Sequence, residues 1–248
     1  MVARQDLATD PALLEALLTA RRGTAFFGRK LNELSDEDLS GPSLLPGWTR
    51  AHVIAHVGYN ARAIARLMEW ANTGVETPMY ASARARNEEI EYGATLPPAA
   101  LRHLVEHSAI HLNVEWRDTP PHAWARRVKT AQGRTVPATE TVWMRTREVW
   151  VHAVDLANGA SFADIPAPVL ERLLKDIAAA WHARGSDKDL VLKISGAPAL
   201  TELGDLDAPD PEIVSGSLAE ITAWAAGRHT RGLTSSRHGE PGPAPRWL

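Results

Sequence analysis

Four polar residues in one segment are spaced so that a helix would present them together: Arg145, Glu148, His152 and Asp155. Steps of three and four residues place side chains on one helix face. A carboxylate and an imidazole one turn apart can both bind the same metal ion. The rest of the segment is apolar, which is typical of a buried helix. The polar stripe is therefore either an inward-facing site or a solvated row of ion pairs.

A second pair of histidines, His52 and His56, lies one turn apart in an earlier segment with helical periodicity. Either imidazole could join Glu148 and His152 as a third ligand. A set of two histidines and one glutamate leaves coordination positions open, as a catalytic metal requires. His56 lies closer to the apolar stripe, where it could also be a hydrogen-bonded histidine at the margin of the core. Periodicity does not choose between the two.

Three more histidines, His103, His107 and His111, form a row on a third helical segment. At 100° per residue they lie roughly opposite the apolar stripe that includes Leu101 and Leu112. We therefore expect this row to face solvent and to be dispensable for metal binding.

Composition excludes several classes of chemistry. The 248 residues contain no cysteine, so disulfides, thiolate ligands and a cysteine nucleophile are excluded, and any thiol must come from outside. The formal net charge is −3 with no basic block, which argues against a nucleic-acid partner. No apolar run approaches the roughly 20 residues of a membrane span. The N-terminus shows no apolar secretory segment, so we expect a cytoplasmic protein without a membrane partner.

The elements that would position these side chains are mainly helices. Asp10 and Pro11 resemble an N-cap followed by proline in the first turn, and Thr49 resembles a second cap. The pattern predicts four long helices joined by loops, with a mixed polar stretch at 73–96 and a crossover at 117–139. Four such helices suggest a four-helix bundle. The helices are expected over about 11–34, 49–72, 97–116 and 140–157.

The character of the chain changes after residue 160. A helix, a branched strand, two weaker strands and a final helix are expected, and Ser217 with Glu220 forms a capping-box pattern. The overall fold class is thus α+β. We expect a helical bundle over 1–160, a small α/β domain over 161–233 and a flexible tail over 234–248. The C-terminal elements are expected at about 166–184, 189–195, 199–204, 211–216 and 217–227.

Two segments carry a family resemblance. LPGWTRAHVIAHVGYNA (45–61) and MRTREVWVHAVDL (144–156) resemble the mycothiol-dependent maleylpyruvate isomerase family. The resemblance spans essentially the whole chain, including AEITAWAAGR (219–228). It implies a DinB-like metal-binding four-helix bundle joined to a small C-terminal α/β domain similar to sterol-carrier folds.

The resemblance also implies roles for particular residues. The metal ligands of the family match His52, Glu148 and His152, which favours His52 over His56. The metal would be zinc or another divalent ion. The arginine that ends the 219–228 segment matches Arg228, which would reach the active site from the C-terminal domain.

The implied activity is a cis–trans isomerisation in gentisate degradation, with maleylpyruvate as substrate and mycothiol as the thiol cofactor. Zinc would stabilise the thiolate, which adds to the activated double bond. Rotation about the resulting single bond and elimination would give fumarylpyruvate. A mycothiol S-transferase is an alternative, and it would consume thiol during turnover. A second alternative is a non-enzymatic, metal-stabilised binding protein for an apolar ligand.

Overall fold

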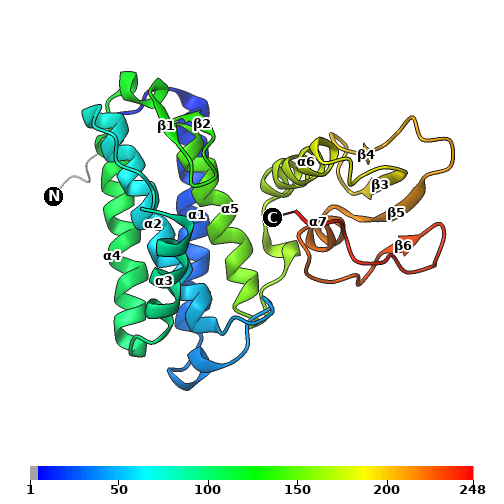
Figure 1. Cartoon of the computed structure of the whole chain (residues 1–248), viewed down its shortest axis with the longest axis horizontal. Helices are drawn as coiled ribbons and strands as arrows, with labels where there is room; N and C mark the ends of the chain where they lie inside the picture. The colour runs from blue at the N-terminus through cyan, green and yellow to red at the C-terminus, as the bar shows by residue number, and fades with distance from the viewer. Residues whose placement is uncertain (1–4, 248) are drawn as a thin grey trace. The chain divides into compact units, whose positions relative to one another are not determined.

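The computed structural model describes residues 5–247, which divide between Ala160 and Ser161 into two compact units. The first unit contains a four-helix bundle, as the sequence predicts (Figure 1). Within it α1 packs against α5, and α2 packs against both α4 and α5. The bundle helices are α1 (Pro11–Asn32), α2 (Arg50–Thr73), α4 (Pro98–Asp118) and α5 (Glu140–Asp155).

Local capping fixes where the first helices begin. Asp10 accepts a hydrogen bond from the Ala12 amide at 3.0 Å, and Pro11 occupies the first helical position. α2 begins after Thr49 with a capping box in which the reciprocal side chain is that of His52. These contacts satisfy amide groups that have no partner inside the helix. The predicted cap positions at Asp10 and Thr49 are therefore confirmed.

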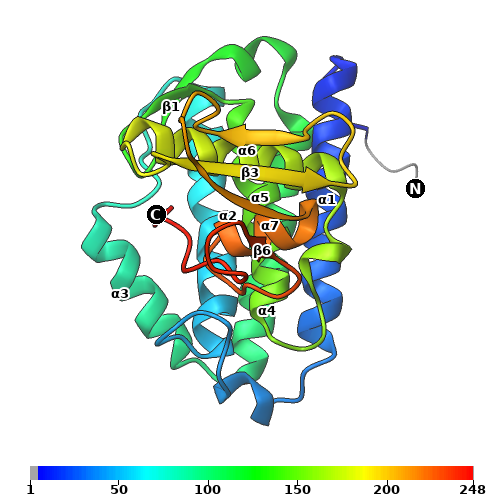
Figure 2. The same cartoon turned by 90° about the vertical axis from the view of Figure 1, so that its right-hand side faces the viewer.

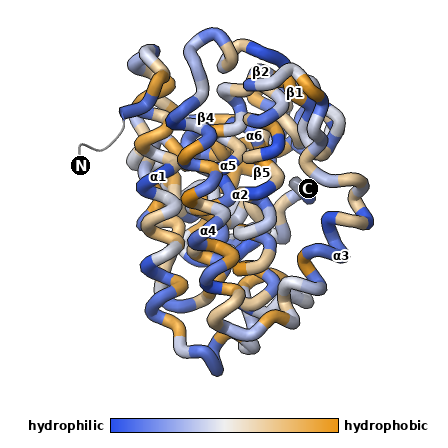
Figure 3. The backbone as a smooth tube through the Cα atoms, turned by 90° about the vertical axis from the view of Figure 1, so that its left-hand side faces the viewer, coloured by the Kyte–Doolittle hydropathy of each residue, from blue (hydrophilic) through white to orange (hydrophobic). Residues whose placement is uncertain are grey.

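The bundle core is built from the apolar stripes of its helices, and Figure 3 shows hydrophobic and hydrophilic residues alternating along them. Leu17, Ile64 and Leu67 are fully buried. Helix α1 approaches α5 closely at Gly23, where an added Cβ atom would lie 2.6 Å from Trp150 Nε1. A larger residue there would push α1 away from α5. Among residues 5–247, no helix is long and apolar enough to cross a membrane.

The polar stretch between α2 and α4 contains a helix that the sequence pattern did not predict, α3 (Ala83–Ala94). Ser82 caps it by accepting a hydrogen bond from the Ala85 amide at 3.0 Å. Its buried residues are Ile90 and Gly93, and it packs on α2 beside the bundle (Figure 2). With so few apolar positions, α3 lacks the stripe that reveals an amphipathic helix.

The expected crossover between α4 and α5 also has structure of its own. It holds the short 3₁₀ helix η2 (Pro121–Ala125) and the antiparallel pair β1 (Arg127–Lys129) and β2 (Thr135–Pro137). Two further 3₁₀ turns are η1 (Glu37–Ser40), in the loop before α2, and η3 (Phe162–Asp164), at the start of the second unit.

The second unit is a four-stranded sheet of order β4-β3-β5-β6 with two helices. The central pair, β3 and β5, is parallel, and the outer strands are antiparallel to their neighbours. Trp181 and Trp224 join the two helices edge to face at 5.9 Å. The elements are α6 (Ala167–Ala183), β3 (Leu190–Ser195), β4 (Glu202–Gly204), β5 (Glu212–Ser217), α7 (Leu218–Ala225) and β6 (Thr234–Ser235).

The stretch expected to be a flexible tail is tied to this unit. Its first residues form β6, which pairs with β5 through Val214 and Ser215. Farther along, Trp224 Nε1 donates a hydrogen bond to the Gly242 carbonyl at 2.7 Å. Glycine and proline content suggested a loose segment, but backbone pairing and a tryptophan anchor hold it in place.

Candidate metal centre

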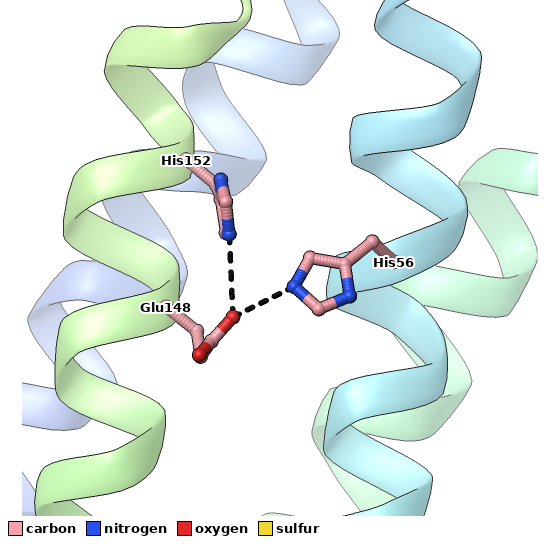
Figure 4. Close-up of side chains that lie close together, drawn as sticks. All are labelled: His56, Glu148 and His152. Atoms are coloured by element: carbon pink, nitrogen blue, oxygen red, sulfur yellow. Dashed lines mark hydrogen bonds and ion pairs between the residues drawn. The ribbon is translucent and has the colours of Figure 1, made fainter. Parts of the chain in front are cut away.

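Three side chains that could bind one metal ion converge between α2 and α5 (Figure 4). His56 comes from α2, and Glu148 and His152 come from successive turns of α5. Glu148 Oε2 lies 2.8 Å from His56 Nε2 and 3.3 Å from His152 Nε2. One ligand atom from each residue lies within 4.8 Å of the other two. The group thus offers two nitrogens and one oxygen to a common centre.

The structure does not bring His52 into this group, contrary to the ligand set that the family resemblance implied. His52 occupies the third position of α2, where its Nδ1 lies 2.7 Å from Thr49 Oγ1 and 3.2 Å from the Thr49 amide. Its Nε2 lies 3.4 Å from Glu91 Oε2 on α3. One ring nitrogen is therefore used in the helix cap, and the other faces a different helix.

The Glu148 carboxylate is held ionised by its neighbours. Burial alone would raise the pKa of Glu148, but hydrogen bonds from His152 and His56 lower it well below its usual value. His56 is 5% exposed, and burial lowers its pKa despite the hydrogen bond to Glu148. A neutral imidazole beside an ionised carboxylate is the protonation state that metal binding needs.

His152 is held by a second carboxylate. Its Nδ1 lies 2.8 Å from Oδ2 of Asp155, which is fully buried. Burial lowers the pKa of His152, but hydrogen bonds with Asp155 and Glu148 outweigh this effect and raise it to about 9. With a metal on Nε2, the Nδ1 atom of His152 would keep its proton and donate it to the Asp155 carboxylate. Carboxylates commonly orient metal-binding histidines in this way.

The donor set suits zinc. Imidazole nitrogen and carboxylate oxygen are both zinc ligands, and three protein ligands leave one tetrahedral position for an incoming group. Asp155 already orients one of the two rings. The site is deep: His56 is buried, and the side chains of Glu148 and His152 are 15% and 13% exposed.

Aromatic and basic side chains surround the three ligands. The Trp48 ring lies 5.6 Å from the His56 ring, so Trp48 flanks the site. Trp150, on the same helix as Glu148 and His152, stacks on Phe26 at 5.1 Å. Arg147 Nη2 lies 3.7 Å from Glu148 Oε1, and Arg86 Nη2 lies 3.4 Å from His56 Nδ1. The sequence analysis missed Arg86 because it lies on the unpredicted α3.

The row of His103, His107 and His111 is exposed, as predicted. The first two rings stack at 5.7 Å. His111 Nε2 lies 3.5 Å from Glu115 Oε1 and 4.0 Å from Glu69 Oε1, which makes a second group of possible ligands. The side chain of His111 is 50% exposed and that of Glu69 is 44% exposed. Unlike the buried group, this one faces solvent.

Arg228 lies in the second unit, just after α7. Its amide donates to the Ala223 carbonyl at 2.9 Å, and its guanidinium donates to the Ala226 carbonyl. Gly227 makes this turn with φ +78°, a conformation that favours glycine. Arg228 thus caps the C-terminal end of its own helix.

Comparison with known proteins agrees with this architecture. Residues 20–157 match the family model described as the mycothiol maleylpyruvate isomerase N-terminal domain. A crystal structure of a mycothiol-dependent maleylpyruvate isomerase is 52% identical, with a TM-score of 0.90, and the match covers 95% of this chain and 97% of that one. A structure of a histidine-to-alanine mutant of a mycothiol-dependent maleylpyruvate isomerase gives the same values. A search of curated proteins found no match. The chain therefore belongs to the mycothiol-dependent maleylpyruvate isomerase family.

Proposed function

We propose that the protein is a cytoplasmic, zinc-containing isomerase that converts maleylpyruvate to fumarylpyruvate with mycothiol as cofactor. The observation that carries this proposal is the buried group of His56, Glu148 and His152 in a chain of this family. We take His56 as the α2 ligand in place of His52, because it alone of the two contacts Glu148.

Cis–trans isomerisation of an activated double bond requires a nucleophile that adds and leaves again. The chain has no cysteine, so a thiol must be supplied from outside. Zinc held by these three side chains would lower the pKa of a coordinated mycothiol thiol and so supply a thiolate near neutral pH. This chemistry suits a metal site with one open position.

The side chains of the site have separate tasks in this scheme. Glu148, His56 and His152 hold the metal, and Asp155 fixes the orientation of the His152 ring. Trp48 lies edge to face beside the His56 ring and would line the side of the site next to that ligand. Arg228 would pair with a substrate carboxylate or stabilise charge that develops on the keto oxygen, as the family implies.

The proposal is tested by assaying the zinc-loaded protein on maleylpyruvate with and without mycothiol. We expect fumarylpyruvate to form only when both zinc and the thiol are present, with no net loss of thiol. Activity without thiol would contradict the proposal. Stoichiometric loss of thiol, with a conjugate as product, would instead identify an S-transferase. A folded, zinc-replete protein that turns over no electrophile would favour a binding protein.

A further inference from the structure

Arg86 is brought to the metal centre by the packing of α3 on α2. Arg86, Ile90 and Gly93 are spaced by four and three residues, so they share the helix face that meets α2. Ile90 is buried, and a Cβ atom added at Gly93 would lie 2.7 Å from the Ala55 Cβ atom. This close approach places the Arg86 guanidinium against His56, with Nη2 3.4 Å from Nδ1.

Arg86 has no carboxylate partner within residues 5–247, although other arginines nearby do. Its remaining hydrogen bond runs from Nη1 to the neutral amide oxygen of Asn87 at 3.1 Å. On the same helix, Arg84 pairs with Glu88 at 3.1 Å. A guanidinium stays charged at any working pH and binds carboxylates bidentately. The half-buried Arg86 side chain therefore offers a charge that the fold does not neutralise.

The hydrogen bond between Arg86 and His56 uses the ring nitrogen that does not face Glu148. An arginine only donates hydrogen bonds, so His56 Nδ1 accepts from Arg86 and Nε2 carries the ring proton toward Glu148. A metal ion on Nε2 would move that proton to Nδ1, where it would face the Arg86 donors. The guanidinium would then be free to bind another acceptor beside the ligands.

The charges around the ligands favour an anion at this place. Among the described residues, Asp155 and Glu148 both pair with His152, while Arg147 and Arg86 lie against Glu148 and His56. Addition of a divalent ion makes the surroundings more positive. Arg147 already lies beside the Glu148 carboxylate, and Arg145 is buried with its Nη1 donating to the Val57 carbonyl and to Asn60 Oδ1. Arg86 is therefore the cation best placed to bind an incoming carboxylate.

We propose that Arg86 is a specificity-determining residue that pairs with one carboxylate of a dianionic substrate at the metal centre. This inference rests on the proposed function, in which the substrate has two carboxylates. Each carboxylate of such a substrate needs a cation to offset its charge, and Arg86 supplies one beside the metal ligands. Arg86 would then make the site prefer dicarboxylates to monocarboxylates.

The test compares the wild-type protein with Arg86→Gln and Arg86→Lys, all zinc-loaded, and with Arg84→Gln as a matched control on the exposed face of α3. Zinc content is measured first. The dissociation constants of succinate and butyrate, a non-reacting dicarboxylate and a monocarboxylate, are then measured by calorimetry. Steady-state kcat and KM are measured on maleylpyruvate with mycothiol.

We expect Arg86→Gln to keep its zinc, to weaken succinate binding and to raise KM by roughly 10- to 100-fold, with little change in butyrate binding. Arg86→Lys should fall between, and Arg84→Gln should match the wild type. Unchanged succinate affinity and KM in zinc-replete Arg86→Gln would overturn the role of Arg86. Failure of the wild type to isomerise maleylpyruvate would refute the proposed function instead, and the succinate comparison would still decide on Arg86.

Discussion

Replacing His56 and His52 one at a time tests which histidine of α2 binds the metal. His56→Ala removes the nitrogen that lies 2.8 Å from Glu148, whereas His52→Ala removes a helix-cap contact. Four-ligand structural zinc sites bind with about 10–16 kcal/mol, so one ligand accounts for roughly 2.5–4 kcal/mol. We therefore expect His56→Ala to weaken zinc binding roughly 100- to 1,000-fold. His52→Ala should cost about 1 kcal/mol of stability and keep the zinc.

The assay is competition for zinc with a chromophoric chelator, combined with elemental analysis and thermal unfolding of the metal-free proteins. His56→Gln is a matched variant, because its amide can still donate a hydrogen bond to Glu148 but is a poor zinc ligand. It separates ligand loss from the cost of leaving a buried carboxylate with one partner fewer. Full zinc affinity in both His56 variants, with loss in His52→Ala, would refute the site and restore His52 as the ligand.

Three further outcomes are expected. The pKa of His152 is about 9 before zinc binds, and zinc needs the neutral imidazole. Zinc affinity, measured by chelator competition, should therefore rise about tenfold per pH unit from pH 7 to about 9 and then level off. A flat profile would contradict the raised pKa of His152. Arg228→Ala should keep zinc and folding but lose roughly 2–4 kcal/mol of transition-state stabilisation, whereas intact turnover would leave Arg228 only as a helix cap. Replacing all three histidines of the exposed row, His103, His107 and His111, by alanine should leave zinc content and activity unchanged. Loss of the tightly bound zinc in this triple variant would contradict the solvent-facing position assigned to the row.

The long helices could be predicted because their signals are local. Asp10 and Pro11 start α1, and Ser217 with Glu220 starts α7 with the capping box that the pattern indicates. The α3 helix was missed because two buried positions, Ile90 and Gly93, make no periodic stripe. Ser82 was its available signal, since a serine followed by a run rich in alanine, arginine and glutamate suits a helix start.

The choice between His52 and His56 could not be made from spacing. The two residues are four apart, so they point within about 40° of each other and lie about 6 Å apart along the helix axis. Which ring meets Glu148 depends on how far α2 is shifted along α5, and this shift is set by packing between distant parts of the chain. The Thr49 cap was the usable local signal, because a capping box takes up the side chain at its third position.

We expect a metal ion bound by these three side chains to be catalytic rather than structural, because three protein ligands leave a coordination position open. In the metal-free site, His56 and His152 both donate to Glu148, and Asp155 accepts from His152, so the buried charges already satisfy one another. The bundle around them has a continuous apolar core of its own. A divalent ion held by these side chains would replace the protons on His56 Nε2 and His152 Nε2, while the ionised Glu148 has no proton to lose. Three protein ligands would leave a coordination position open, which is what a site for a borrowed thiol requires.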